Sequence, residues 1–155
     1  MSKRKIKKWQ WLVLVVMVIF AGGLKLYQNH LPTVSIELSQ KKLNVLVART
    51  AYEQKKGLGS RESLDPYDGM IFIYSTPVRS VMVMRDMKFS IDIVWFLNGE
   101  VVDIAPNLPI EPNASDEELV RYYSRKQANL VLELPAGWTK ENNLKIGDKI
   151  GLVED

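Results

Sequence analysis

An uncharged apolar segment near the N-terminus constrains the architecture of this chain more than any other feature of the sequence. Residues 9–24 carry no charge, and Gln10 is their only clearly polar side chain. Extending the segment to Tyr27 gives about 19 residues, enough for a helix to cross a bilayer core of roughly 30 Å. We therefore expect a basic cytoplasmic flank at 1–8, a transmembrane helix at 9–27, a linker at 28–32 and one folded domain at 33–155.

The charges around this segment predict its orientation. Five basic residues precede the segment, whereas Lys25 alone follows it closely. Positive charge is retained on the cytoplasmic side, so the N-terminus is expected inside and the domain outside the cytoplasm. A cleaved signal peptide stays open as an alternative, because Ala21 and Gly23 are the small residues that a cleavage site requires, and cleavage would leave the domain secreted. A buried helix is disfavoured by the basic front, and a surface helix by the lack of a polar face.

The composition of the domain excludes several classes of function. The net charge of +3 is misleading, because six of the 21 basic residues lie at the N-terminus while all 18 acidic residues follow residue 28. The domain is therefore acidic, which argues against nucleic acid as a partner. There is no cysteine, and His30 in the linker is the only histidine. Disulfides, thiolate catalysis and a histidine-ligated metal are thereby excluded, and the position of His30 argues against a Ser-His-Asp triad. We expect no metal and no cofactor.

Alternating apolar residues predict a strand-rich domain. About eight segments have the pattern of strands: 33–39, 43–47, 69–74, 80–85, 91–97, 100–105, 129–134 and 149–153. Strands mostly follow strands rather than alternating with helices. We therefore predict an α+β domain with a mostly antiparallel, barrel-like sheet and two or three short helices.

Local motifs predict the turns and the short helices. Asn98-Gly99 is typical of a two-residue hairpin turn, and Pro106 begins a proline-containing loop that runs to residue 113. Capping boxes at 50–53 and 115–118 each predict a helix. The first helix should end at Gly57 in a left-handed conformation, and the second near residue 122 or 123. A further helical turn is expected between 138 and 143.

Four charged residues stand beside or inside apolar strands and turns: Arg61, Arg85, Asp92 and Glu133. Asp92 shares a strand face with Ser90 and Val94, and Glu133 lies between leucines that point to the opposite face. Surface charge or a structural ion pair would explain each of them separately. Apolar strands seldom carry inward charges unless these are paired or used, so we predict that the four converge in a polar pocket at one end of the barrel.

The sequence resembles the domain of unknown function 192 family of prokaryotes. The matching segments are Gly57-Leu58 with Arg61 and Leu64, Gly69 to Phe72, Asp92-Ile93, Leu132 to Gly137, and Gly147-Asp148. The third motif of the family, which follows the segment Gly69 to Phe72, has drifted at 84–87, where Val83 stands in place of tryptophan. The resemblance covers nearly all of residues 33–153. It implies a small β-barrel-like domain with peripheral helices, often exported or lipid-anchored, and it implies no established activity.

Two functions remain open at this point. The first is a membrane-proximal module that binds a polar envelope ligand, such as a glycan, or another envelope protein. The second is a hydrolase that uses Asp92 and Glu133 as acid and base, which requires the two carboxyl groups about 5 to 10 Å apart in one cleft. A structural envelope protein without a ligand is a third possibility.

Overall fold

The computed structural model describes residues 8–28 and 31–153, with side-chain surroundings for 9–20 and 31–153. The chain divides into two compact units, which meet between Leu31 and Pro32. The first unit contains helix α1, Lys8–Gln28, which covers the helix predicted at 9–27. Within the described residues, no helix combines the length and apolar character that a membrane crossing requires. The basic residues before Lys8 and the linker residues 29 and 30 lie outside the described part.

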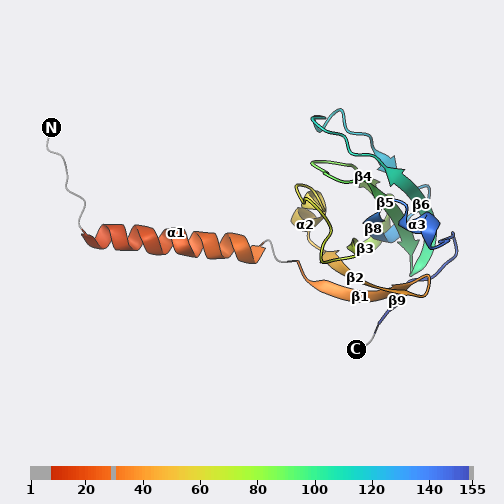
Figure 1. The fold of residues 1–155 in the computed structure, drawn as a ribbon, viewed down its shortest axis with the longest axis horizontal. Helices are drawn as coiled ribbons and strands as arrows, with labels where there is room; N and C mark the ends of the chain where they lie inside the picture. Colours follow the sequence, from red (N-terminus) through yellow and green to blue (C-terminus); the bar gives the residue numbers. More distant parts are fainter. Residues whose placement is uncertain (1–7, 29–30, 154–155) are drawn as a thin grey trace. The chain divides into compact units, whose positions relative to one another are not determined.

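The second unit is built on a curled sheet of seven strands, in the order β6-β5-β8-β3-β2-β1-β9 (Figure 1). These strands are β1 Thr33–Leu38, β2 Lys41–Ala48, β3 Gly69–Val78, β5 Ile91–Leu97, β6 Glu100–Leu108, β8 Ala128–Pro135 and β9 Gly151–Leu152. All neighbouring strands are antiparallel except β2 and β3. A second small sheet pairs β4, Val81–Met82, with β7, Tyr122–Tyr123. The prediction of a strand-rich α+β domain with a curled, mostly antiparallel sheet is therefore confirmed.

The two edges of the large sheet approach each other through the C-terminal segment. An isolated antiparallel bridge joins Glu100 at the start of β6 to Lys149, and the amide of Ile150 donates to the carbonyl of Gly99 at 2.9 Å. Two residues later the same segment pairs with β1 as β9. The curled sheet thus comes close to a barrel, which leaves few unpaired edge groups.

Strand register gives the sheet two chemically different faces. The inner face, inside the curl, carries a continuous apolar cluster that includes Ile71, Val94, Leu132 and Leu134. The outer face carries the alternate residues: Leu46, Met70, Phe72, Ile93, Trp95, Val131 and Glu133. All seven are buried, so the outer face is covered as well.

Helix α2, Ala51–Lys56, and the segment 79–90 cover part of this outer face. The cap Thr50 accepts from the amide of Glu53, whose carboxylate accepts from the amide of Thr50, so the first capping box is confirmed. Gly57 ends α2 at φ 49 and ψ −138, which is a positive φ but not the left-handed helical conformation predicted. The Trp95 indole donates to the Ser80 hydroxyl at 3.0 Å and thereby fixes the covering segment to β5.

The hairpin turns agree with the sequence prediction. Asn98 and Gly99 have φ values of 51 and 83, so both central residues adopt the positive φ that this turn demands. Ser39 and Gln40, in the turn between β1 and β2, also have positive φ values. A helical turn after Gly137 is also confirmed, as α3, Trp138–Glu141.

The second capping box does not start a helix, and this prediction was wrong. The Glu118 carboxylate accepts hydrogen bonds from the amide and the hydroxyl of Ser115. The bond from the Ser115 amide is one of the two bonds of a capping box. However, the amide of Val120 donates to the Glu111 carboxylate at 2.9 Å instead of continuing a helical ladder. The chain then enters β7, so a side chain from the preceding loop ends the helical turn.

Three predicted boundaries also change. The strand expected at 80–85 is reduced to the two residues of β4, because a turn closes from the amide of Met87 to the carbonyl of Met84. The last strand, expected at 149–153, is only β9. Conversely, β6 runs through Pro106 to Leu108, where a loop was predicted, because Leu108 still pairs with Ile91.

Gly69 allows β3 and β8 to approach closely beside Glu133, and its substitution is the first test of this packing. A Cβ at Gly69 would lie 2.4 Å from the Glu133 carbonyl oxygen, a distance that backbone movement alone can relieve. Gly69→Ala should therefore lower the free energy of unfolding by about 1–3 kcal/mol in urea denaturation. Gly151→Ala is the matched control, because nothing lies within 4 Å of its Cβ position. Equal effects of the two substitutions would contradict the close approach.

Candidate functional site

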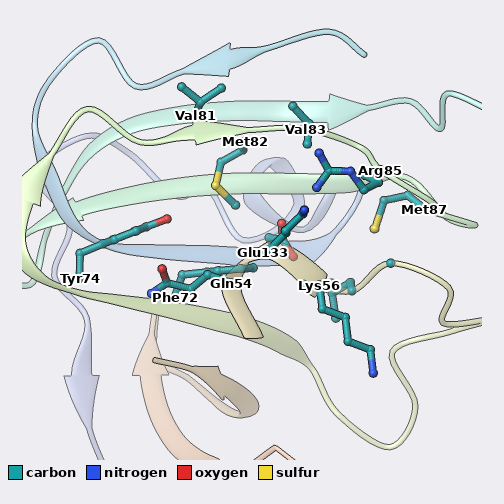
Figure 2. A pocket seen from close by; sticks show the side chains of 14 residues that line it. Gln54, Lys56, Phe72, Tyr74, Val81, Met82, Val83, Arg85, Met87 and Glu133 are labelled. Carbon is teal, nitrogen blue, oxygen red and sulfur yellow. The ribbon is translucent and has the colours of Figure 1, made fainter. Parts of the chain in front are cut away.

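A pocket of about 360 Å³ opens on the outer face of the sheet, under α2 and the covering segment (Figure 2). Its walls come from four parts of the chain: the end of α2 with Gly57 to Gly59, strand β3, strand β8 and residues 81–87. The end of α2 lies against β3 at Gly57, where an added Cβ would be 3.5 Å from the Phe72 ring. The volume falls in the range of small-molecule sites.

Glu133 is the central polar group of this pocket. It is the outward residue of Leu132-Glu133-Leu134 on β8, paired with Met70 on one side and Ile93 on the other. Its side chain is only 5% exposed, and within the described residues its Oε2 atom has no hydrogen-bond partner. Burial raises the pKa of Glu133 to about 8. The carboxyl is therefore mostly protonated at neutral pH and can donate a hydrogen bond.

The surroundings of Glu133 are partly apolar and partly polar. Phe72, Met82 and Met87 supply buried apolar surface. Tyr74 lies on the same face of β3, and in Figure 2 it stands on the side of Glu133 away from Arg85. Burial raises the pKa of Tyr74; a hydrogen bond with Ser80 opposes this rise, and negative charge on Glu133 adds to it. A ligand would thus meet apolar walls and two hydroxyl-type donors.

The rim of the pocket carries cationic side chains. Lys55 and Lys56 come from the last turn of α2, and Arg85 comes from the covering segment. The Arg85 Nε donates to Asp116 Oδ1 at 2.7 Å, which lowers the pKa of Asp116, and Lys55 and Arg121 lower it further. The 113–121 segment is thereby tied to the rim by an exposed ion pair.

Asp92 belongs to a different environment. It pairs with Leu134 in the register of β5 and β8, whereas Glu133 pairs with Ile93, so the two carboxyl groups point to opposite faces of the sheet. Asp92 is fully buried and accepts four hydrogen bonds: from the amides of Asn107, Gly137 and Thr139, and from the Thr139 hydroxyl, at 2.6–2.9 Å. It holds β6 and the start of α3 against β5.

Of the four predicted site residues, Arg85 and Glu133 line one pocket, and Asp92 and Arg61 do not. Arg61 is half-buried in the loop after α2, where the neighbouring amide of Ser60 donates to the Asp86 carbonyl. Sequence reasoning missed Tyr74 and Lys55. The alternation of Met70, Phe72 and Tyr74 could have indicated the first, since alternate residues of a strand share a face. In the described part of the chain, no three acidic or histidine side chains form a group that could hold a metal ion.

Comparison with known sequences identifies the family. The profile of the domain of unknown function 192 family, described as an uncharacterized ACR, matches residues 34–152. The chain belongs to this family. The matched region includes every residue that lines the Glu133 pocket. A search of the curated proteins finds no match.

Two solved structures share the fold of this family member. One is a suggested transcription regulator from Sinorhizobium meliloti 1021, with 23% identity, a TM-score of 0.69 and coverage of 79% of this chain and 95% of that chain. The other is a protein of unknown function from Novosphingobium aromaticivorans, with 26% identity, a TM-score of 0.64 and coverage of 77% and 84%. The first likeness bears on the fold alone.

Asp92→Asn tests the structural role assigned to Asp92. An asparagine keeps the shape but turns an amide N–H group toward backbone amides that need an acceptor. We expect the free energy of unfolding to fall by about 2–4 kcal/mol. Asp68→Asn is the control, because exposed Asp68 accepts one surface hydrogen bond, from the Asn44 amide, and should cost under about 1 kcal/mol. An unchanged melting temperature for Asp92→Asn would contradict this role.

Glu133 should also make the stability of the domain depend on pH. The ordinary pKa of 4.5 applies to the unfolded chain and about 8 to the folded chain, so between these values the folded state holds a proton that the unfolded state has lost. The free energy of unfolding must then fall as the pH rises from about 5 to 8, by up to about 1.4 kcal/mol per pH unit. Calorimetry should show a smaller fall for Glu133→Gln and the wild-type fall for exposed Glu37→Gln. The same slope in all three proteins would contradict a buried, neutral Glu133.

Proposed function

We propose that this protein is a membrane-tethered binding module, which takes a small polar ligand in the Glu133 pocket on the outer side of the cytoplasmic membrane. The observation that carries the proposal is a buried carboxyl group that the protein itself leaves unsatisfied: Glu133 lines the pocket, and its Oε2 atom has no hydrogen-bond partner among the described residues. A ligand with an acceptor oxygen would accept a hydrogen bond from the protonated carboxyl on its pocket side.

A ligand explains the energetics of Glu133 better than a structural role does. Buried polar groups are almost always hydrogen-bonded, because an unpaired one costs roughly 1–3 kcal/mol. Asp92, on the neighbouring strand, has four donors and supports that rule. Groups that lower stability in this way are characteristic of binding sites.

The same geometry favours binding over hydrolysis. Acid–base hydrolysis by Asp92 and Glu133 would need both carboxyl groups in one cleft, but the strand register assigns them to opposite faces. Glu133 is the only carboxyl group among the pocket-lining residues, which also include no serine, threonine or histidine. We therefore do not put the hydrolase forward.

The membrane tether is supported by the sequence. Residues 9–24 are uncharged, and five basic residues precede them. The described side chains of α1, from Trp9 to Phe20, are exposed. Exposed apolar side chains over several helical turns, as at residues 9–20, are stable in lipid and costly in water. Residues 29–32 connect α1 to β1 and reach at most about 14 Å, so a tethered domain would stay close to the bilayer.

One preparation tests both parts of the proposal. The full chain is expressed in a bacterium, and its membranes are washed with alkaline carbonate. The full chain should remain in the membranes, and protease added to spheroplasts should digest the domain. A chain that starts at residue 29 should leave with the wash. Release of the full chain, or complete protection from protease, would contradict the tether or its orientation.

The membranes are then solubilised, and the full chain is examined by native mass spectrometry. The wild type should carry a bound small molecule, as should the control Glu37→Gln. Glu133→Leu should lose the ligand while its melting temperature at pH 8 rises, because the unpaired carboxyl has been removed. A wild type without a ligand, or an equal ligand content in Glu133→Leu, would contradict the binding site.

A further inference from the structure

Charge is distributed unequally between the rim and the interior of the Glu133 pocket. The rim carries Lys55, Lys56 and Arg85. The interior carries Glu133, which burial keeps protonated, and Tyr74. At neutral pH the charged groups that line the pocket are therefore all cationic. The pocket combines positive potential at its entrance with a neutral hydrogen-bond donor inside.

Acidic groups lie near the rim but are not among the residues that line the pocket. Asp116 pairs with Arg85, and Arg121 lies close enough to lower the pKa of the same Asp116. Glu117 and Glu118 are exposed on the same loop, and Glu118 is bound by the amide and hydroxyl of Ser115. None of these three acidic residues lines the pocket.

We propose that the ligand of this pocket is a small organic anion, whose carboxylate or phosphate lies between Lys55 and Arg85 and whose neutral oxygen accepts a hydrogen bond from Glu133. This inference rests on the proposed function, because it specifies the ligand class of the same site. The apolar side chains of Phe72, Met82 and Met87 contact the carbon skeleton between the two polar ends.

A cationic ligand fits the pocket less well. An ammonium group could pair with Glu133 only after the carboxyl ionised, and both charges would then be desolvated in a buried position. The ligand would also have to pass the cationic side chains of Lys55 and Arg85. An anion avoids both costs: its charge stays at the exposed rim, and a neutral oxygen meets a neutral carboxyl inside.

Four sugars with the same ring test the inference, because they differ in charge: glucuronate, glucose 6-phosphate, glucose and glucosamine. Binding to the full chain in detergent is measured by calorimetry at pH 7. We expect at least one of the two anions to bind about tenfold more tightly than glucose, and glucosamine to bind weakest. The preference should shrink at high salt, because the rim charges are exposed. The comparison of the two anions decides between carboxylate and phosphate.

Variants separate the contribution of the rim from that of the interior. Lys55→Gln should weaken the anion about two- to fivefold and leave glucose unchanged, as expected for one exposed charge pair. Lys140→Gln, which removes the same charge from exposed α3, should change neither. Glu133→Leu should weaken all of the sugars that bind. Raising the pH through 8 should also weaken them, as Glu133 loses its proton.

The outcomes distinguish this inference from the proposed function. If glucose and the anions bind the wild type equally, and this binding is lost in Glu133→Leu, the anion preference is overturned but the binding site is supported. Tightest binding of glucosamine would also overturn it, and would indicate ion pairing with Glu133. Failure of all four sugars to bind at millimolar concentration would overturn this inference, whereas the proposed function would be overturned by the absence of a bound small molecule in native mass spectrometry.

Discussion

The position of β8 in the middle of the sheet is the constraint on which the rest of the structure depends. Paired with β3 on one edge and β5 on the other, β8 contributes leucines to the inner face and Glu133 to the outer face. A slip of one residue would place a carboxyl group in the apolar interior of the curl and two leucines in the pocket. The close approach of Gly69 to the Glu133 backbone holds this register from the β3 side.

The two buried carboxyl groups of the sheet show how position determines role. Asp92 has four donors and links three segments of the chain, so its charge is satisfied by the protein itself. Glu133 lies on the neighbouring strand and points to the opposite face of the sheet. Apolar side chains surround it in a pocket whose rim carries cationic residues. Burial without donors keeps its proton, and a neutral donor beside cationic groups is complementary to an anion with a neutral oxygen. The segment 84–87 contributes Arg85 and Met87 to this same pocket.

Much of the fold could be predicted from the sequence, because it depends on local patterns. The alternation in β1, β5 and β8, the Asn98-Gly99 turn and the first capping box each act over a few residues, and the structure confirms them. The faces of Asp92 and Glu133 relative to one another depend on the pairing of strands about 40 residues apart, which no local pattern contains. The helix predicted from the capping box at Ser115 does not form, because the Glu111 carboxylate accepts the hydrogen bond of the Val120 amide that would otherwise continue the helix. The local pattern at 115–118 does not contain this contact. Alternation along β3 could have assigned Tyr74 to the face of Phe72. The pocket itself requires α2 to fold over β3, so Lys55 could not be assigned to a site from sequence alone.

The central claim is that Glu133 is a buried carboxyl group that keeps its proton at neutral pH. A carbon-13 NMR titration of the side-chain carboxyl groups, with Glu133 assigned by comparison with Glu133→Gln, measures this directly. The account predicts that the Glu133 resonance titrates with a midpoint at about 8 and that an anionic ligand of the proposed class moves the midpoint higher. A midpoint near the ordinary glutamate value of 4.5 would contradict it.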